Sequence, residues 1–325
     1  MPLRAALLGL VAFAFVNHAA AFDLQGHRGA RGLAPENTLP AFSRALGIGV
    51  STLELDVGVT RDGIVVVSHD RRLNPDIARG PDGRWLRPPT PLIHELTFHE
   101  LQRYDVGRIR PGSEYSRRFP DQRKADGVRI PMLESVFELA RHARNDKVRF
   151  SIEAKLSPET PDETLPPEEF ARAVVKVIRA NGMERRTMVQ SFDWRALAVI
   201  QREAPEIETA HLTAQREWMD NIGAGHQEAS PWTGGILYQG SIPKMVKAAG
   251  GRTWSPFYGD LDEASLKEAK SLGLRVVPWT VNDRAQMEQL IDAGADGLIT
   301  DYPDRLRDVM AAKGLPLPTP TSIAP

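Results

Sequence analysis

The sequence predicts an α/β protein whose strands close into a (β/α)8 barrel. From Asp23 onward, short apolar segments alternate with amphipathic ones, which is typical of βα units around a parallel sheet. The chain has 325 residues, of which 42% are hydrophobic, so it can fill one large core. Acidic residues and histidines stand near the ends of several apolar segments, where a barrel of this kind carries its functional residues.

Nine segments of the chain read as extended. We expect strands at 24–29, 52–57, 64–68, 148–154, 187–191, 206–212, 253–257, 275–281 and 297–300, and helices at 37–45, 133–144, 169–180, 194–202, 263–272 and 284–293. No helix separates the second segment from the third, and the turn Asp62-Gly63 favours a hairpin between them. The third segment is therefore expected to be a hairpin arm, which leaves eight barrel strands. An open, doubly wound sheet is the alternative fold.

Residues 71–130 interrupt this pattern and are expected to form a small insertion after the second strand and its hairpin. The segment carries 13 Arg and Lys residues against 8 Asp and Glu residues, and its one clear helix start is the capping box at Thr97. An insertion in a βα loop lies at the catalytic face of a barrel, where a basic cap would attract anionic substrates. A plain solvated insertion is equally consistent with this composition. Residues 215–250 fit no clear element.

The two ends of the chain are expected to lie outside the barrel domain, which spans residues 22–313. Arg4, an apolar run and Ala19-Ala20-Ala21 have the form of a signal peptide, so we expect residues 1–21 to be removed and the protein to be exported, to the periplasm or beyond. The apolar run is too short for a stable membrane anchor, since about 20 residues are needed to span. The proline-rich residues 314–325 are expected to be a disordered tail.

Composition excludes several classes of protein and site. The net charge of −1 argues against nucleic-acid binding. The chain has no cysteine, so it has neither disulfides nor thiolate metal ligands. Its oligomeric state cannot be read from the sequence.

Three carboxylates stand at strand ends where a cation could join them. Glu54 and Asp56 are two residues apart on one strand, so they share a face, about 7 Å apart. Glu153 repeats this placement on a later strand, beside Lys155. Alone, such a pair could equally be neutralised by arginine. Together, the three acids predict a pocket for one divalent cation, Mg²⁺ or Ca²⁺, which prefer oxygen ligands.

Two histidines accompany these acids. His27 and His69 follow apolar segments in the same part of the chain, and an imidazole can give or take a proton near pH 7. Either one alone would more often be structural, but the two beside a cation pocket favour acid–base catalysis. Arg28 and Lys155 could neutralise the acids or bind a phosphate. The residues thus favour a metal-assisted phosphodiesterase.

At these residues the chain resembles the glycerophosphodiester phosphodiesterase family. The resemblance runs in order from residue 24 to about 310. Its elements are His27-Arg28-Gly29, Pro35-Glu36-Asn37-Thr38, Glu54-x-Asp56, Thr60-x-Asp62-Gly63, His69-Asp70, Ile152-Glu153-x-Lys155, Gln190-Ser191-Phe192-Asp193, Trp279-Thr280-Val281-Asn282, Asp296-Gly297 and Thr300-Asp301-Tyr302-Pro303.

This resemblance implies a TIM barrel with a small insertion after the second strand. It implies a small-molecule substrate, a deacylated phospholipid such as glycerophosphocholine or glycerophosphoethanolamine, which is hydrolysed to sn-glycerol 3-phosphate and an alcohol. The implied metal ligands are Glu54, Asp56 and Glu153, and the implied acid–base pair is His27 and His69. Arg28 and Lys155 would hold the phosphate, and Trp279 would lie near the apolar part of the substrate.

Three alternatives share these residues. A phospholipase similar to sphingomyelinase D would use the same histidines and acids on intact lipid. A phosphodiesterase acting on polyglycerophosphate would need an open groove. An exported protein that binds phosphate esters without turnover is the third, although binding alone does not call for two proton carriers.

Overall fold

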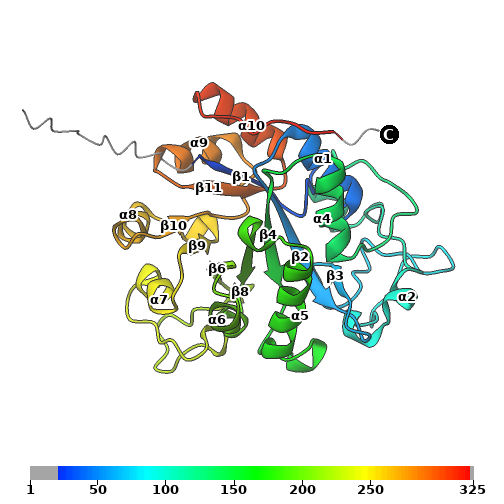
Figure 1. The fold of residues 1–325 in the computed structure, drawn as a ribbon, viewed down its shortest axis with the longest axis horizontal. Coiled ribbons are helices and arrows are strands. Elements are labelled where there is room, and N and C mark those ends of the chain that lie inside the picture. The colour runs from blue at the N-terminus through cyan, green and yellow to red at the C-terminus, as the bar shows by residue number, and fades with distance from the viewer. Residues whose placement is uncertain (1–20, 323–325) are drawn as a thin grey trace, which may run out of the picture.

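The computed structural model of the protein describes residues 21–322 and shows the expected barrel. Eight parallel strands follow one another around it in the order β10-β9-β6-β5-β4-β2-β1-β11 (Figure 1). Their bounds are Asp23–Gly26 for β1, Thr52–Val59 for β2, Arg149–Ala154 for β4, Thr187–Ser191 for β5, Glu208–Thr213 for β6, Thr253–Pro256 for β9, Arg275–Val276 for β10 and Gly297–Thr300 for β11.

Hydrogen bonds between the backbone around β10 and β11 close the barrel. The amide of Asp296 donates to the carbonyl of Val276 at 2.8 Å, and the amide of Ile299 donates to Pro278 at 3.0 Å. β10 is shorter than the predicted strand 275–281, because Pro278 has no N–H for a regular ladder. The predicted closed barrel is confirmed, and the open sheet is excluded.

Helices surround the strands on the outside of the barrel (Figure 1). They are α1 (Leu39–Ile48), α4 (Leu133–His142), α5 (Pro167–Ala180), α6 (Trp194–Glu203), α7 (Ile242–Ala248), α8 (Glu263–Ser271), α9 (Arg284–Asp292) and α10 (Pro303–Ala312). Within residues 21–322, none of the helices has the length and apolar character needed to cross a membrane.

The alternation of side chains along β2 divides the core from the site. Leu53, Leu55 and Val57 are fully buried in the apolar layer between the strands and the helices. Glu54 and Asp56 lie between them in sequence and therefore point to the opposite face, into the barrel. The same strand thus anchors the fold and carries two of the predicted site residues.

The insertion has the predicted place and a small core of its own. β3 (Val65–Val67) runs antiparallel to β2, so the predicted hairpin arm is confirmed. The chain then forms the short helices α2 (Phe98–Leu101) and α3 (Glu114–Arg118). Leu73, Ile93 and Leu101 pack with Val66 of β3, and this second apolar cluster fixes the insertion on the barrel.

Two segments differ from the sequence prediction or were not predicted, and a third lies outside the described residues. Residues 215–250 contain a hairpin of β7 (Gln215–Arg216) and β8 (Met219–Asp220), followed by α7, which has only seven residues. The prediction of a disordered tail at 314–325 is wrong for the residues up to Thr321. The amide of Thr321 donates to the carbonyl of Leu46, and Arg307 binds the carbonyl of Pro318, so the tail is held against α1 and α10. The predicted signal peptide at 1–21 lies almost wholly outside the described residues.

Candidate active site

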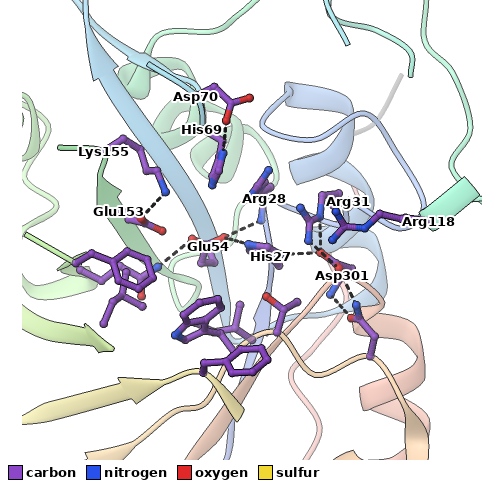
Figure 2. A pocket seen from close by; sticks show the side chains of 18 of the residues that line it. His27, Arg28, Arg31, Glu54, His69, Asp70, Arg118, Glu153, Lys155 and Asp301 are labelled. Atoms are coloured by element: carbon purple, nitrogen blue, oxygen red, sulfur yellow. Dashed lines mark hydrogen bonds and ion pairs between the residues drawn. The ribbon is translucent and has the colours of Figure 1, made fainter. Parts of the chain in front are cut away.

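Three carboxylates meet inside the barrel at the ends of two neighbouring strands. β2 and β4 pair in parallel with Asp56 opposite Glu153, and Glu54 lies two residues before Asp56 on the same face. One carboxylate oxygen of each residue lies within 4.8 Å of the others, and all three residues are buried. Figure 2 shows Glu54 and Glu153 at the centre of the site, between His27 and Lys155. The structure thus brings together the three acids that the sequence singled out.

Neighbouring side chains orient these acids but leave one carboxylate oxygen without a hydrogen bond. Gln190 donates to Glu54 Oε1 at 2.9 Å, and Asn37 donates to Asp56 Oδ2 at 2.9 Å. Asp56 Oδ1 is buried and accepts no hydrogen bond from the described residues, and the Lys155 ammonium lies 3.7 Å from it. A buried carboxylate oxygen without a partner is costly unless a cation meets it. The oxygen-only cluster therefore fits a hard divalent ion such as Mg²⁺ or Ca²⁺.

The acids strongly favour an added positive charge. Burial and the neighbouring carboxylate of Asp56 raise the pKa of Glu54 well above its ordinary value. Burial likewise raises the pKa of Glu153 to about 7, although the ammonium group of Lys155 opposes this rise. Burial also acts against the charged form of Asp56, but His69, Arg28 and Lys155 outweigh it and hold the pKa of Asp56 below its usual range.

His27 is held from one side by a carboxylate that the sequence analysis gave no role. Its Nδ1 lies 2.6 Å from Asp301 Oδ1, while its Nε2 faces Glu54 Oε2 at 3.9 Å. Arg31 binds both oxygens of Asp301, at 2.7 and 3.0 Å, and keeps that group charged. Burial and the nearby guanidinium of Arg31 lower the pKa of His27 to about 4. His27 therefore presents a neutral Nε2 to the acids.

His69 approaches from the other side, on the segment that follows β3. Its Nδ1 lies 2.7 Å from Asp70 Oδ1, so it too is oriented through Nδ1 by a carboxylate. Burial, together with Arg28 and Lys155, lowers its pKa well below the ordinary value. Arg71 and Arg72, which follow directly, both bind Glu163 at 2.9 and 2.8 Å. These ion pairs tie the His69 segment to the loop after β4.

Arg28 and Lys155 both reach the acids. The guanidinium of Arg28 lies 2.6 Å from Glu36 and 3.3 Å from Asp56, and Lys155 Nζ lies 2.6 Å from Glu153. Arg28 has a left-handed backbone with φ of 49°, and its amide donates to Glu54 at 2.8 Å. Gly29 follows with φ of 85°, and a Cβ there would lie 2.9 Å from the carbonyl oxygen of Ala41. Only glycine therefore lets this turn pack against α1.

A cavity of about 420 Å³ opens above the acids. The predicted residues His27, Arg28, Glu54, His69, Glu153, Lys155 and Trp279 all line it. Tyr115 and Arg118 of the insertion also line it, so the insertion does form part of the cap. In Figure 2, Arg118 lies beside Arg31 and Asp301.

Several residues of the site were not predicted as such. Asp301, Glu36, Asn37 and Gln190 fall within the motifs of the family resemblance, but each role depends on a contact between two motifs or elements, or across a loop, that only the fold shows. Glu36 also accepts a hydrogen bond from Tyr115, which joins the insertion to the site. The only available signal was the presence of these polar residues beside the predicted strand ends.

Comparison with known proteins agrees with this geometry. The model of the glycerophosphoryl diester phosphodiesterase family matches residues 27–305. The chain belongs to this family. It is therefore a phosphodiesterase that shares the family's barrel.

Individual family members cover nearly the same length. A glycerophosphodiester phosphodiesterase of Bacillus altitudinis is 31% identical, covering 86% of this chain and 94% of that protein. A glycerophosphodiester phosphodiesterase of Caldanaerobacter subterraneus is 28% identical over 89% of this chain and 97% of its own length.

Solved structures of the family share the fold. The crystal structure of a glycerophosphoryl diester phosphodiesterase from Silicibacter pomeroyi is 34% identical, with a TM-score of 0.81, and covers 92% of this chain and 96% of that one. A phosphodiesterase from Oleispira antarctica, solved with the product sn-glycerol 3-phosphate, has a TM-score of 0.65 at 21% identity. Its chain is covered over 96% of its length, and 88% of this chain is covered.

Proposed function

We propose that this protein is a divalent-metal-dependent enzyme that hydrolyses glycerophosphodiesters to sn-glycerol 3-phosphate and an alcohol. The observation that carries the proposal is the buried cluster of Glu54, Asp56 and Glu153, with His27 and His69 in the same cavity. The relatives named above support the substrate class, as does the product found in the Oleispira antarctica structure. Glycerophosphocholine and glycerophosphoethanolamine are the substrates we expect.

Glu54, Asp56 and Glu153 would hold one Mg²⁺ or Ca²⁺ ion. When bound there, the ion supplies positive charge against the phosphate oxygens. Asn37 and Gln190 fix the orientation of Asp56 and Glu54 through their side-chain amides. Lys155 and Arg28 keep the remaining carboxylate charge balanced, and we propose that both also contact the phosphate from the cavity side.

The two histidines would carry the protons of the reaction. One takes the proton of the attacking hydroxyl, from water or from the 2-hydroxyl of the glycerol, and the other gives a proton to the oxygen of the leaving alcohol. Asp301 holds the Nδ1–H of His27, so Nε2 faces the acids and can accept a proton; whichever histidine acts as the acid must enter the reaction with a proton on Nε2. His69 is held in the same way by Asp70. Trp279, which lines the cavity, would contact the apolar part of the substrate.

The experiment that tests this proposal is a coupled assay for glycerol 3-phosphate on glycerophosphocholine. We expect turnover that EDTA abolishes and that added Mg²⁺ or Ca²⁺ restores. Turnover that is insensitive to EDTA would remove the metal from the mechanism. Absence of turnover on every glycerophosphodiester, with hydrolysis of intact lipid, would favour a phospholipase instead.

We also propose that the protein is exported and that its leader is cleaved after Ala21. This proposal rests on the sequence of residues 1–21 alone. Protein recovered outside the cytoplasm should begin at Phe22 by mass spectrometry. Uncleaved protein confined to the cytosolic fraction would contradict it.

A further inference from the structure

The cavity has two chemically different halves that follow the order of the strands. Every charged or histidine side chain that lines it comes from the neighbouring strands β4, β2, β1 and β11 or from the segments that follow them. The lining residues that follow β5, β6, β9 and β10 are all uncharged. Four of these are aromatic, and we call them the aromatic wall: Phe192, Trp218, Phe257 and Trp279.

The rings of the aromatic wall are steeply inclined to one another, with interplanar angles of 60° to 88°. Trp279 is the central member, with its centroid 5.3 Å from Phe192, 5.5 Å from Phe257 and 6.1 Å from Trp218. Its indole N–H donates to the carbonyl of Ser255 at 2.9 Å, which fixes the ring. All four rings line the cavity, so together they offer aromatic surface to a ligand there.

The wall begins beside the acids. The Lys155 ammonium lies 5.9 Å from the centroid of Phe192 and 2.6 Å from Glu153. The guanidinium of Arg216 lies 5.1 Å from the centroid of Phe257. Two rings of the aromatic wall, Phe192 and Phe257, thus already lie next to a cationic side chain of the protein. No lysine or arginine in residues 21–322 lies over the ring of Trp218 or Trp279 in this way.

Trp218 needs an explanation, because 61% of its surface is exposed. It stands at the turn of the hairpin of β7 and β8, and this hairpin is firmly attached to the barrel. Asp260 accepts a hydrogen bond from the amide of Gln215 at 2.8 Å and pairs with Arg216 at 2.8 Å. Trp218 is therefore held over Phe257, at a centroid distance of 5.4 Å, with its other surface free for a ligand.

We propose that the aromatic wall binds the alcohol that leaves in the reaction, and that it selects an alcohol carrying a quaternary ammonium group. This inference rests on the proposed function. If the phosphodiester group lies over the acids, the glycerol and the leaving alcohol on either side of the phosphate must extend into the charged half and the aromatic half of the cavity. The hydroxyls of glycerol need hydrogen-bond partners, which the charged half provides. A quaternary ammonium has no N–H to satisfy and is attracted to aromatic faces.

The test compares three substrates that share glycerol phosphate and differ in the alcohol. They are glycerophosphocholine, bis-glycerophosphate and the 3,3-dimethylbutyl ester, which has the shape of the choline ester without its charge. We expect the wild-type enzyme to favour the choline ester over both others in kcat/KM. In Trp218→Ala, the ratio of kcat/KM for glycerophosphocholine to kcat/KM for bis-glycerophosphate should fall about fivefold, mainly because KM for glycerophosphocholine rises. Trp218→Phe should restore most of this ratio.

Leu237→Ala provides the matched control. Leu237 is another exposed large apolar residue, 38% exposed, and does not line the cavity, so its removal should leave the substrate ratio unchanged. The inference is overturned if Trp218→Ala lowers kcat/KM by the same factor for all three substrates. It is also overturned if the wild-type enzyme hydrolyses the neutral 3,3-dimethylbutyl ester with the same kcat/KM as the choline ester. A wild-type enzyme that hydrolyses none of the three would instead contradict the proposed function.

Lysophosphatidylcholine separates this inference from binding of an acyl chain. If the aromatic wall holds the alcohol, Trp218→Ala should lower kcat/KM for lysophosphatidylcholine and for glycerophosphocholine by similar factors, because both substrates release choline. A much larger loss on lysophosphatidylcholine would show that the wall holds the acyl chain and would overturn the proposal.

Discussion

Asp301 and His27, which are 274 residues apart, form a direct contact of 2.6 Å between a carboxylate oxygen and Nδ1. Asp301 lies at the end of the last strand and His27 at the end of the first, so closure of the barrel creates this pair. Asn282 donates to the second oxygen of Asp301 at 2.7 Å, and Arg31 binds both oxygens. The carboxylate is thus fixed by two side chains, Asn282 and Arg31, and fixes the imidazole in turn.

We predict that Asp301→Asn lowers kcat about 10²-fold, since the amide cannot hold His27 in the same tautomer. KM should change little, because Asp301 lies behind the imidazole. Steady-state kinetics on glycerophosphocholine measure both values. Asp308→Asn, an exposed carboxylate paired with Arg284, is the control and should behave as wild type. A variant Asp301→Asn with full kcat would remove the positioning role.

Removal of either imidazole should reduce turnover and leave the metal site intact. We predict that His27→Ala and His69→Ala each lower kcat by about 10²–10⁴-fold. His99, an exposed histidine on α2 of the insertion, provides His99→Ala as the control. Full activity in either of the first two variants would contradict the acid–base assignment. Calorimetric titration with Mg²⁺ or Ca²⁺ would show whether a loss of rate came from a loss of metal.

The sequence predicted the carboxylate cluster because strand periodicity is local. Glu54 and Asp56 share a face by their spacing alone, and Glu153 stands at the same height because β4 pairs with β2. Asp301 could not be assigned in this way, since it acts on His27, which only the closed barrel brings near. The hairpin that carries Trp218 was missed for another reason: its strands have two residues each, too few to show any alternation.

Direct binding measurements should show the role of the acids. We predict that Glu153→Gln weakens binding of Mg²⁺ or Ca²⁺ at least about tenfold by isothermal titration calorimetry, because it replaces a charged oxygen ligand by a neutral one. Added metal should also raise the Tm of the wild type more than that of the variant. Glu134→Gln on the outer face of α4 is the control. Equal affinity in Glu153→Gln and wild type would exclude Glu153 as a ligand.

His211 should make the fold sensitive to acid. It is fully buried in β6 and packs edge to face on Trp194 of α6, with centroids 4.9 Å apart. Burial lowers its pKa from 6.5 to about 3. The native protein keeps His211 neutral, whereas the unfolded chain takes up a proton below pH 6.5. This residue should therefore remove up to about 1.4 kcal/mol of stability per pH unit between pH 6.5 and 3.

Urea unfolding at pH 7, 6, 5 and 4 tests this prediction. His211→Leu should lose less stability than the wild type as the pH falls, and its advantage should grow below pH 6.5. His142→Leu, at an exposed histidine on α4, should follow the wild type. Parallel pH profiles for His211→Leu and the wild type would contradict the assignment.

His69 follows the antiparallel arm β3, whereas Glu54, Asp56 and Glu153 belong to barrel strands, and His27 directly follows one. One of the two proton carriers is therefore delivered by the segment that leads into the insertion. Exchange of this insertion between family members would therefore alter the position of His69, and with it the rate of proton transfer, together with the entry of substrate. The carboxylates would stay in place, so such chimeras should still bind the cation even where they no longer turn over.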